Sequence, residues 1–146
     1  MCNVLHEIAP SDWPSVFRDL AGLLNDRGHL LVVEDQRIPT GEKAHNQGFL
    51  ILDGPHLAKL FGRRERDPKI LSVQAMEGRL KAHLVPAMLP GRVSPETRRA
   101  ALESLCESCK VEIQRLRAGP ATSRGGHLHG LYAQMLANAT LALEAL

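Results

Sequence analysis

Two titratable side chains near the start of the chain suit proton transfer. His6 follows the apolar residues Val4 and Leu5, and Glu7 comes directly after it. An imidazole has an ordinary pKa of about 6.5, so His6 can act near neutral pH as a general base that takes a proton from a substrate hydroxyl. Glu7 can orient His6 or a substrate. The alternatives are structural: His6 hydrogen-bonds the following turn, and Glu7 is a solvated turn carboxylate.

A second group of polar residues follows the apolar run 30–33. Glu34 and Asp35 end this run, and His45 lies in the polar loop after it. Neighbouring strands lie about 4.8 Å apart, so we expect Glu34 and Asp35 to converge with His6 on one cleft and to bind substrate there. Carboxylates beside an imidazole can raise its basicity. His45, in a loop over that cleft, is a third substrate-binding candidate. The alternative for the two carboxylates is a strand-end pair that caps the next loop.

Two further motifs place cysteines or histidines close together. The sequence "CESC" at 106–109 has the spacing of half a zinc site, but it lies in a helical stripe of apolar residues and no second pair exists. Buried core thiols are predicted instead. In "GGHLHG", His127 and His129 face apart on a helix, and no third ligand is evident. We predict no metal site.

The candidate residues require elements that bring segments 1–6 and 29–35 together. Both are predicted to be strands, the second because its apolar run shows no alternation, which is typical of a strand buried on both faces. The segment 11–25 between them carries apolar residues at helical spacing, Trp13 and Leu23 among them. Two strands joined by a helix form a right-handed crossover with a parallel pair.

The rest of the chain is predicted to contain a hairpin and three helices. The strand-like segments 69–76 and 79–86 are separated by Glu77 and Gly78, which fit a two-residue turn. In the second segment, apolar and polar residues alternate in a half-exposed pattern (Leu80, Ala82 and Leu84 against Arg79, Lys81 and His83). The fold class is α/β, with residues 1–90 as one domain and 91–146 as a helical extension packed on it. The predicted helices are 55–62, 94–117 and 127–145, and 36–48 is a loop.

Composition argues against several classes of function. Lys and Arg number 18 against 16 Asp and Glu, and the net charge of +2 is too small to indicate a nucleic-acid partner. No run approaches the roughly 20 apolar residues that a membrane span needs, and no signal peptide is recognised. Three cysteines without framework spacing are typical of a reducing compartment. We predict a cytoplasmic protein.

The stretch "LHE" at 5–7, the following Trp13 and "GHLLVVED" at 28–35 together form a pattern. It resembles the C-terminal half of class I S-adenosylmethionine-dependent methyltransferases, over about residues 1–90. The resemblance implies a partial doubly wound, Rossmann-like sheet whose last two strands form the hairpin. It also implies methyl transfer from S-adenosylmethionine to a small-molecule acceptor, with His6 as general base and Asn3 facing the cofactor. A strand-end Asn that satisfies backbone groups is an equal alternative for Asn3.

The sequence departs from that family in the cofactor region. It has no glycine-rich loop after a first strand and no acidic residue after a second. We therefore expect this chain, a truncated form of the enzyme, to bind S-adenosylmethionine weakly or not at all and to be inactive alone. A strand at 1–6 without its outer neighbour exposes an edge, so we expect a homo-oligomer or a partner that supplies the missing strands. The alternative function is a non-catalytic assembly module whose helical tail mediates association.

Overall fold

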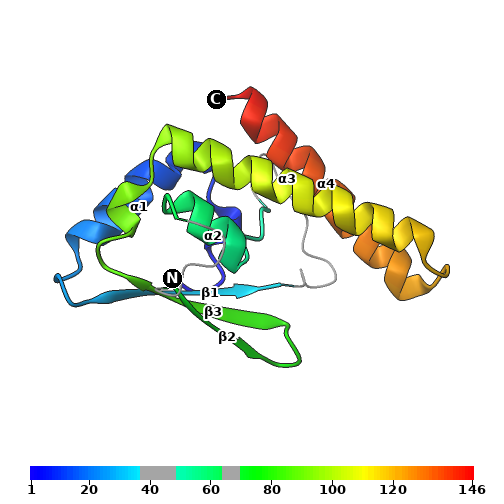
Figure 1. The fold of residues 1–146 in the computed structure, drawn as a ribbon, viewed down its shortest axis with the longest axis horizontal. Coiled ribbons are helices and arrows are strands. Elements are labelled where there is room, and N and C mark those ends of the chain that lie inside the picture. Colours follow the sequence, from blue (N-terminus) through cyan, green and yellow to red (C-terminus); the bar gives the residue numbers. More distant parts are fainter. Residues whose placement is uncertain (37–48, 64–69) are drawn as a thin grey trace.

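The computed structural model describes residues 1–36, 49–63 and 70–146. These residues form a mixed α/β structure in which the helices lie on one side of a small sheet (Figure 1). None of the helices in these ranges has the length and hydrophobicity of a membrane-spanning segment. The α/β class predicted from the sequence is confirmed.

The sheet consists of three antiparallel strands in the order β1-β3-β2. β1 covers His29–Asp35, β2 covers Leu71–Ala75 and β3 covers Leu80–Pro86, so the predicted strand 29–35 and the predicted hairpin are confirmed. The strand that comes last in the chain, β3, therefore lies between the other two. The hairpin connection has four residues, 76–79, in place of the predicted two, and three of them have positive φ (Met76, Glu77 and Gly78).

The N-terminal segment does not form the predicted strand 1–6. Its parallel pairing with β1 is a single bridge between Cys2 and Val33. The Asn3 N–H donates to the Val33 carbonyl at 2.8 Å, and the Val33 N–H donates to the carbonyl of the first residue at 2.9 Å. Asn3 has a left-handed conformation (φ 50°), which ends the extended backbone, and Leu5–Glu7 form a 3₁₀ turn. The predicted pair of parallel strands is reduced to one bridge.

Of the four α-helices in the described ranges, α2, α3 and α4 have side-chain caps at their first turns, whereas α1 has none. The Ser94 hydroxyl accepts from the Thr97 N–H at the start of α3, and the Thr122 hydroxyl accepts from the Gly125 N–H at the start of α4. Because Thr122 caps α4, that helix begins earlier than the predicted residue 127. The bounds are α1 Trp13–Gly22, α2 Gly54–Leu60, α3 Pro95–Ala118 and α4 Ser123–Glu144.

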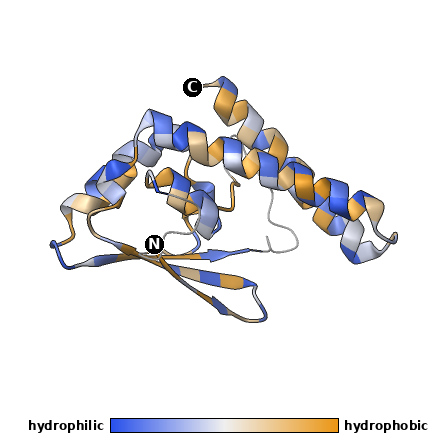
Figure 2. Ribbon diagram, viewed as in Figure 1, coloured by the Kyte–Doolittle hydropathy of each residue, from blue (hydrophilic) through white to orange (hydrophobic). Residues whose placement is uncertain are grey.

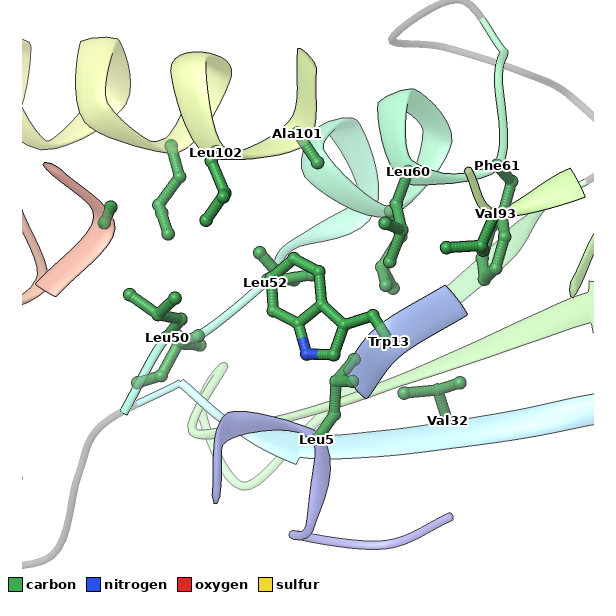
Figure 3. Close-up of a cluster of buried hydrophobic side chains, with 14 of the residues drawn as sticks. Leu5, Trp13, Val32, Leu50, Leu52, Leu60, Phe61, Val93, Ala101 and Leu102 are labelled. Atoms are coloured by element: carbon green, nitrogen blue, oxygen red, sulfur yellow. The ribbon is translucent and has the colours of Figure 1, made fainter. Parts of the chain in front are cut away.

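The hydrophobic core is centred on the indole ring of Trp13 (Figure 3). Trp13 and Phe17 of α1 have no exposed surface, and Trp13 Nε1 donates to the Ile8 carbonyl at 3.1 Å. Leu102 of α3 belongs to the same core, so residues after 90 share one hydrophobic cluster with the α/β part. Leu23, which helical spacing placed on the buried face, is 83% exposed because α1 ends before it.

Helices cover only one face of the sheet among the described residues. In β1, Leu30 and Val32 are buried on the covered face, whereas Leu31 on the other face is 49% exposed. The prediction that 30–33 are buried on both faces is therefore wrong. On β2, Leu71 and Val73 are 59% and 67% exposed. We call the surface formed by Leu31, Leu71, Val73, Ala82 and Leu84 the open face. Figure 2 shows hydrophobic stretches along the strands of the sheet.

The alternation predicted for β3 is present, but its buried residues are not the apolar set. His83 and Val85 have no exposed surface, whereas Leu84 is only partly buried. The register explains this, because His83 lies opposite Val32 and Val85 lies opposite Leu30, both on the covered face of β1. The pairing with β1 thus decides which side of β3 faces the helices.

We expect the open face to make the protein self-associate. Val73→Lys places a charge in the middle of this face and should weaken association at least about tenfold, since burial of a valine side chain contributes about 1.5–3 kcal/mol. Light scattering over a concentration series measures it. The matched control is Val111→Lys, because Val111 is 53% exposed on α3, away from the sheet. An unaltered chain that stays monomeric at every concentration would contradict the expectation.

Candidate functional site

A buried carboxylate and an imidazole meet at the carboxyl end of β1. His6 Nδ1 lies 2.6 Å from Glu34 Oε2, and the exposed fractions of the two residues are 6% and 0%. The other carboxylate oxygen, Oε1, accepts from the Val4 N–H at 3.1 Å and the Leu5 N–H at 2.8 Å. Glu34 therefore accepts three hydrogen bonds from the N-terminal segment. The predicted approach of Glu34 to His6 is present in the structure.

The period of the strand explains how Glu34 reaches this position. Successive side chains of a strand point to opposite faces, so Leu30, Val32 and Glu34 all point to the covered face of β1. A carboxylate buried there needs hydrogen-bond donors, because desolvation without them is costly. Val4, just before the 3₁₀ turn at Leu5–Glu7, and Leu5 within it each supply one backbone N–H group to this carboxylate, and His6 supplies a ring N–H.

The geometry gives the His6 ring one tautomer. A carboxylate can only accept, so Nδ1–H donates to Glu34 and Nε2 is the nitrogen that can take up a proton. A carboxylate in this position orients the imidazole and stabilises the imidazolium that proton uptake creates. The ring is also held edge-on against Phe49, with 6.3 Å between ring centroids. His6 thus has the fixed orientation that a general base requires.

Asp35 does not join this pair. It points to the opposite face of β1, where its Oδ2 accepts from Arg79 Nε at 2.9 Å. Asn3 Oδ1 accepts from the Asp35 N–H at 2.9 Å, so Asn3 satisfies a backbone group at the end of the strand, as the structural alternative for this residue has it. Only one of the two predicted carboxylates therefore meets the imidazole. Glu7 is exposed, and His45 lies outside the described residues.

Sequence reasoning missed an ion pair beside the His6–Glu34 pair, which we call the dyad. Lys81 lies opposite Glu34 in the β1–β3 register, and its Nζ is 2.6 Å from Asp53 Oδ2 at the start of α2. Burial acts to raise the pKa of Asp53, but the hydrogen bonds from Lys81 and from the Gly54 N–H lower that pKa on balance. The alternation in 79–83 marked Lys81 as polar. It gave no sign that its face of the strand is the covered one.

His83 is a second buried imidazole that the sequence did not distinguish. Its Nδ1 lies 2.8 Å from Ser72 Oγ on β2, and its Nε2 is buried without a hydrogen-bond partner in the described ranges. Burial lowers the pKa of His83, against the attraction of the Asp53 and Glu34 carboxylates, so the ring is neutral at pH 7. A neutral ring suits the interior position that β3 gives it.

The remaining cysteine and histidine motifs have structural partners. Cys106 and Cys109 are buried in α3, and burial raises the pKa of both thiols, that of Cys109 to about 12, so neither is a thiolate at neutral pH. His127 and His129 lie within α4, and His129 Nε2 accepts from Arg117 Nε at 3.0 Å. Within the part of the chain that the structure describes, no three potential metal ligands gather.

Comparisons with known proteins give no relative for this arrangement. No family model, no curated protein and no solved structure matches the chain. The features available for assigning a function are therefore the residues and contacts described above. Among the described residues, the His6–Glu34 pair combines an imidazole with a carboxylate that orients it, a geometry suited to proton transfer.

Glu34 should be the residue whose loss costs the fold most at this site. Glu34→Ala leaves two backbone N–H groups and a ring N–H without their acceptor, so we expect the free energy of unfolding to fall by about 3 kcal/mol or more. Glu34→Gln keeps an acceptor and should cost about 1–2 kcal/mol. Urea unfolding measures both.

The control for Glu34 is Glu107→Gln, which removes a carboxylate whose ion pair with Lys110 is exposed on α3. An exposed pair contributes on the order of 0–1 kcal/mol, so this variant should unfold almost as the unaltered chain does. Equal losses for Glu34→Ala and Glu107→Gln would mean that the buried carboxylate does not anchor the N-terminal segment.

Proposed function

We propose that the chain is the acceptor-side part of an S-adenosylmethionine-dependent methyltransferase that acts on a small-molecule acceptor. The observation that carries this proposal is the His6 imidazole, held by Glu34 at the carboxyl end of β1. In open α/β sheets, ligands bind beyond the carboxyl ends of the strands. The position and the fixed tautomer of His6 suit proton removal from an acceptor hydroxyl.

The arrangement of the sheet supports the same proposal. The parallel bridge to Cys2 lies on one side of β1, and the antiparallel hairpin lies on the other. We infer that this is one edge of a doubly wound, Rossmann-like sheet, in which the N-terminal segment stands where a parallel strand would end. Two of the helices on the covered face, α1 and α2, flank β1 in the chain.

The residues of this chain do not by themselves fit the methyl donor. Of the cofactor residues that the resemblance implies, only Asn3 is present, and its side-chain oxygen is bonded to the Asp35 N–H. The sequence offers neither the glycine-rich loop nor the acidic residue of the family. The role we assign to the described residues is therefore restricted to the acceptor: His6 Nε2 takes its hydroxyl proton, and Glu34 stabilises the imidazolium.

We also propose a cytoplasmic location for the protein. All three cysteines are free thiols, with Cys2 exposed and the other two buried in α3. Free thiols are retained in a reducing compartment, whereas secreted proteins pair them.

The chain should bind S-adenosylhomocysteine, the product form of the donor, more weakly than micromolar. The reason is that the glycine-rich loop, which lets backbone approach the cofactor, has no counterpart in the sequence. Calorimetry measures the affinity, and amide NMR shifts locate the contact, which should be confined to residues 2–7 and 34–36. Adenosine monophosphate serves as the control ligand. Micromolar affinity would contradict the expected weakness of binding, and shifts only outside these residues would contradict the methyltransferase proposal.

Replacement of His6 should abolish most of the methyl transfer when the chain is supplied with a polypeptide that carries the glycine-rich cofactor segment. We expect His6→Ala to lower kcat by roughly 10²–10⁴-fold, the usual contribution of a positioned base. Transfer of labelled methyl groups to hydroxylated acceptors measures the rate. His129→Ala, which removes a histidine on α4, is the control. Equal rates for both variants would assign His6 a structural role only.

A non-catalytic assembly module is the second candidate, and the open face is the observation that favours it. Leu31, Leu71 and Val73 present a continuous apolar surface on a sheet that ends in the exposed strand β2. An edge strand of this kind can pair with another chain. Association that depends on Val73, without any response of residues 2–7 to S-adenosylhomocysteine, would favour this candidate over methyl transfer.

A further inference from the structure

A cavity of about 450 Å³ lies between the sheet and the C-terminal helices. One wall consists of Gln36, just after β1, together with Lys81 on β3 and Asp53 at the start of α2. The opposite wall is formed by α3 and α4. The volume falls within the range of small-molecule sites, about 300–1,000 Å³. Neither His6 nor Glu34 lines the cavity, but two lining residues are neighbours of Glu34: Lys81 lies opposite it in the strand register, and Gln36 Nε2 contacts its carbonyl at 3.4 Å.

Both carboxylates in the cavity wall have cationic partners. Asp53 pairs with Lys81 at 2.6 Å, and Glu112 pairs with Arg115 at 2.8 Å. Within each pair, the positive and the negative charge thus compensate each other. A ligand does not need to neutralise either carboxylate, and the Lys81 ammonium already has its counter-ion.

The histidine in the wall is also held by the protein. His56 Nδ1 accepts from the Asp53 N–H at 3.1 Å, which places the ring proton on Nε2, 3.0 Å from Ser108 Oγ. The Ser108 hydroxyl in turn donates to the Ser104 carbonyl at 3.0 Å. His56 is therefore a neutral capping residue that joins α2 to α3. Its ring nitrogens serve the fold.

Two polar groups of the cavity have no such partner, and both are on α4. Arg124 and Tyr132 make no side-chain hydrogen bond or ion pair with any residue that the structure describes. Arg124, Leu128, Tyr132 and Met135 follow each other at intervals of four, four and three residues, so they line one face of α4. This face presents one guanidinium, one hydroxyl and an apolar surface between and beyond them.

We propose that this cavity binds a small organic acid with an apolar, ring-sized body and one anionic group. The anion lies at Arg124, the body packs against Leu128 and the Tyr132 ring, and a polar substituent reaches the Tyr132 hydroxyl. Resting on the proposed function, such an acid is the class of acceptor that the enzyme methylates. The helical pair α3–α4 is then the element that selects the substrate, in addition to its place in the core.

The test titrates the whole chain with indole-3-acetate and with indole-3-acetamide, which has the same ring but no charge. Amide NMR shifts should locate the acid at Leu128, at Tyr132 and at Ile51, which also lines the cavity. The amide should bind about tenfold more weakly because it lacks the charge-assisted contact. Arg124→Gln should weaken binding of the acid about tenfold and leave that of the amide unchanged. Tyr132→Phe keeps the ring and should weaken binding of the acid only slightly.

The control is Arg27→Gln, which removes the same charge from an exposed position before β1, at the other end of the sheet. Equal binding of the acid to the Arg124 and Arg27 variants would overturn the proposal, and so would shifts confined to the open face residues Leu31, Leu71 and Val73. The titration contains no methyl donor. It can therefore fail while S-adenosylhomocysteine still contacts residues 2–7, or succeed while that contact is absent, so the two proposals fail separately.

Discussion

The Glu34 carboxylate is buried on the covered face of β1, and this constraint determines how the N-terminal segment lies. A buried negative charge is tolerated only with donors around it, and here two backbone N–H groups and the His6 ring provide them. Those three bonds draw residues 4–6 into a tight turn over the end of the strand. The turn buries Leu5 against Trp13, so the same interaction that organises the dyad also closes the core.

The covered face of the sheet changes from apolar to polar toward the carboxyl end of β1. The register pairs Leu30 with Val85, then Val32 with His83, then Glu34 with Lys81. The apolar end packs under α1 and α2. The polar end receives Asp53, whose carboxylate both pairs with Lys81 and begins α2. A single strand register thus assigns the core to one end of the sheet and the candidate site to the other.

The sequence predicted those elements whose signals are local. The strand 29–35 and the hairpin were recognisable from an apolar run and from a turn with glycine, and α3 from its apolar stripe. The strand at 1–6 was predicted wrongly, because its backbone N–H groups bond to Glu34, about 30 residues away, and Asn3 leaves the extended region. The buried side of β3 was likewise hidden, since pairing with β1 determines it.

For the candidate site, too, local sequence signals predicted some features, whereas others depend on how distant segments pair. The meeting of His6 with Glu34 followed from two strand ends, but Arg79, Lys81 and Arg124 acquire their roles only through register and through the packing of α4. The cavity and the dyad lie on the covered face, whereas the open face residues Leu31 and Val73 point the other way. A partner seated on the open face would leave the cavity accessible. The proposed association and the proposed small-molecule binding therefore involve opposite sides of one sheet, and neither proposal requires the absence of the other.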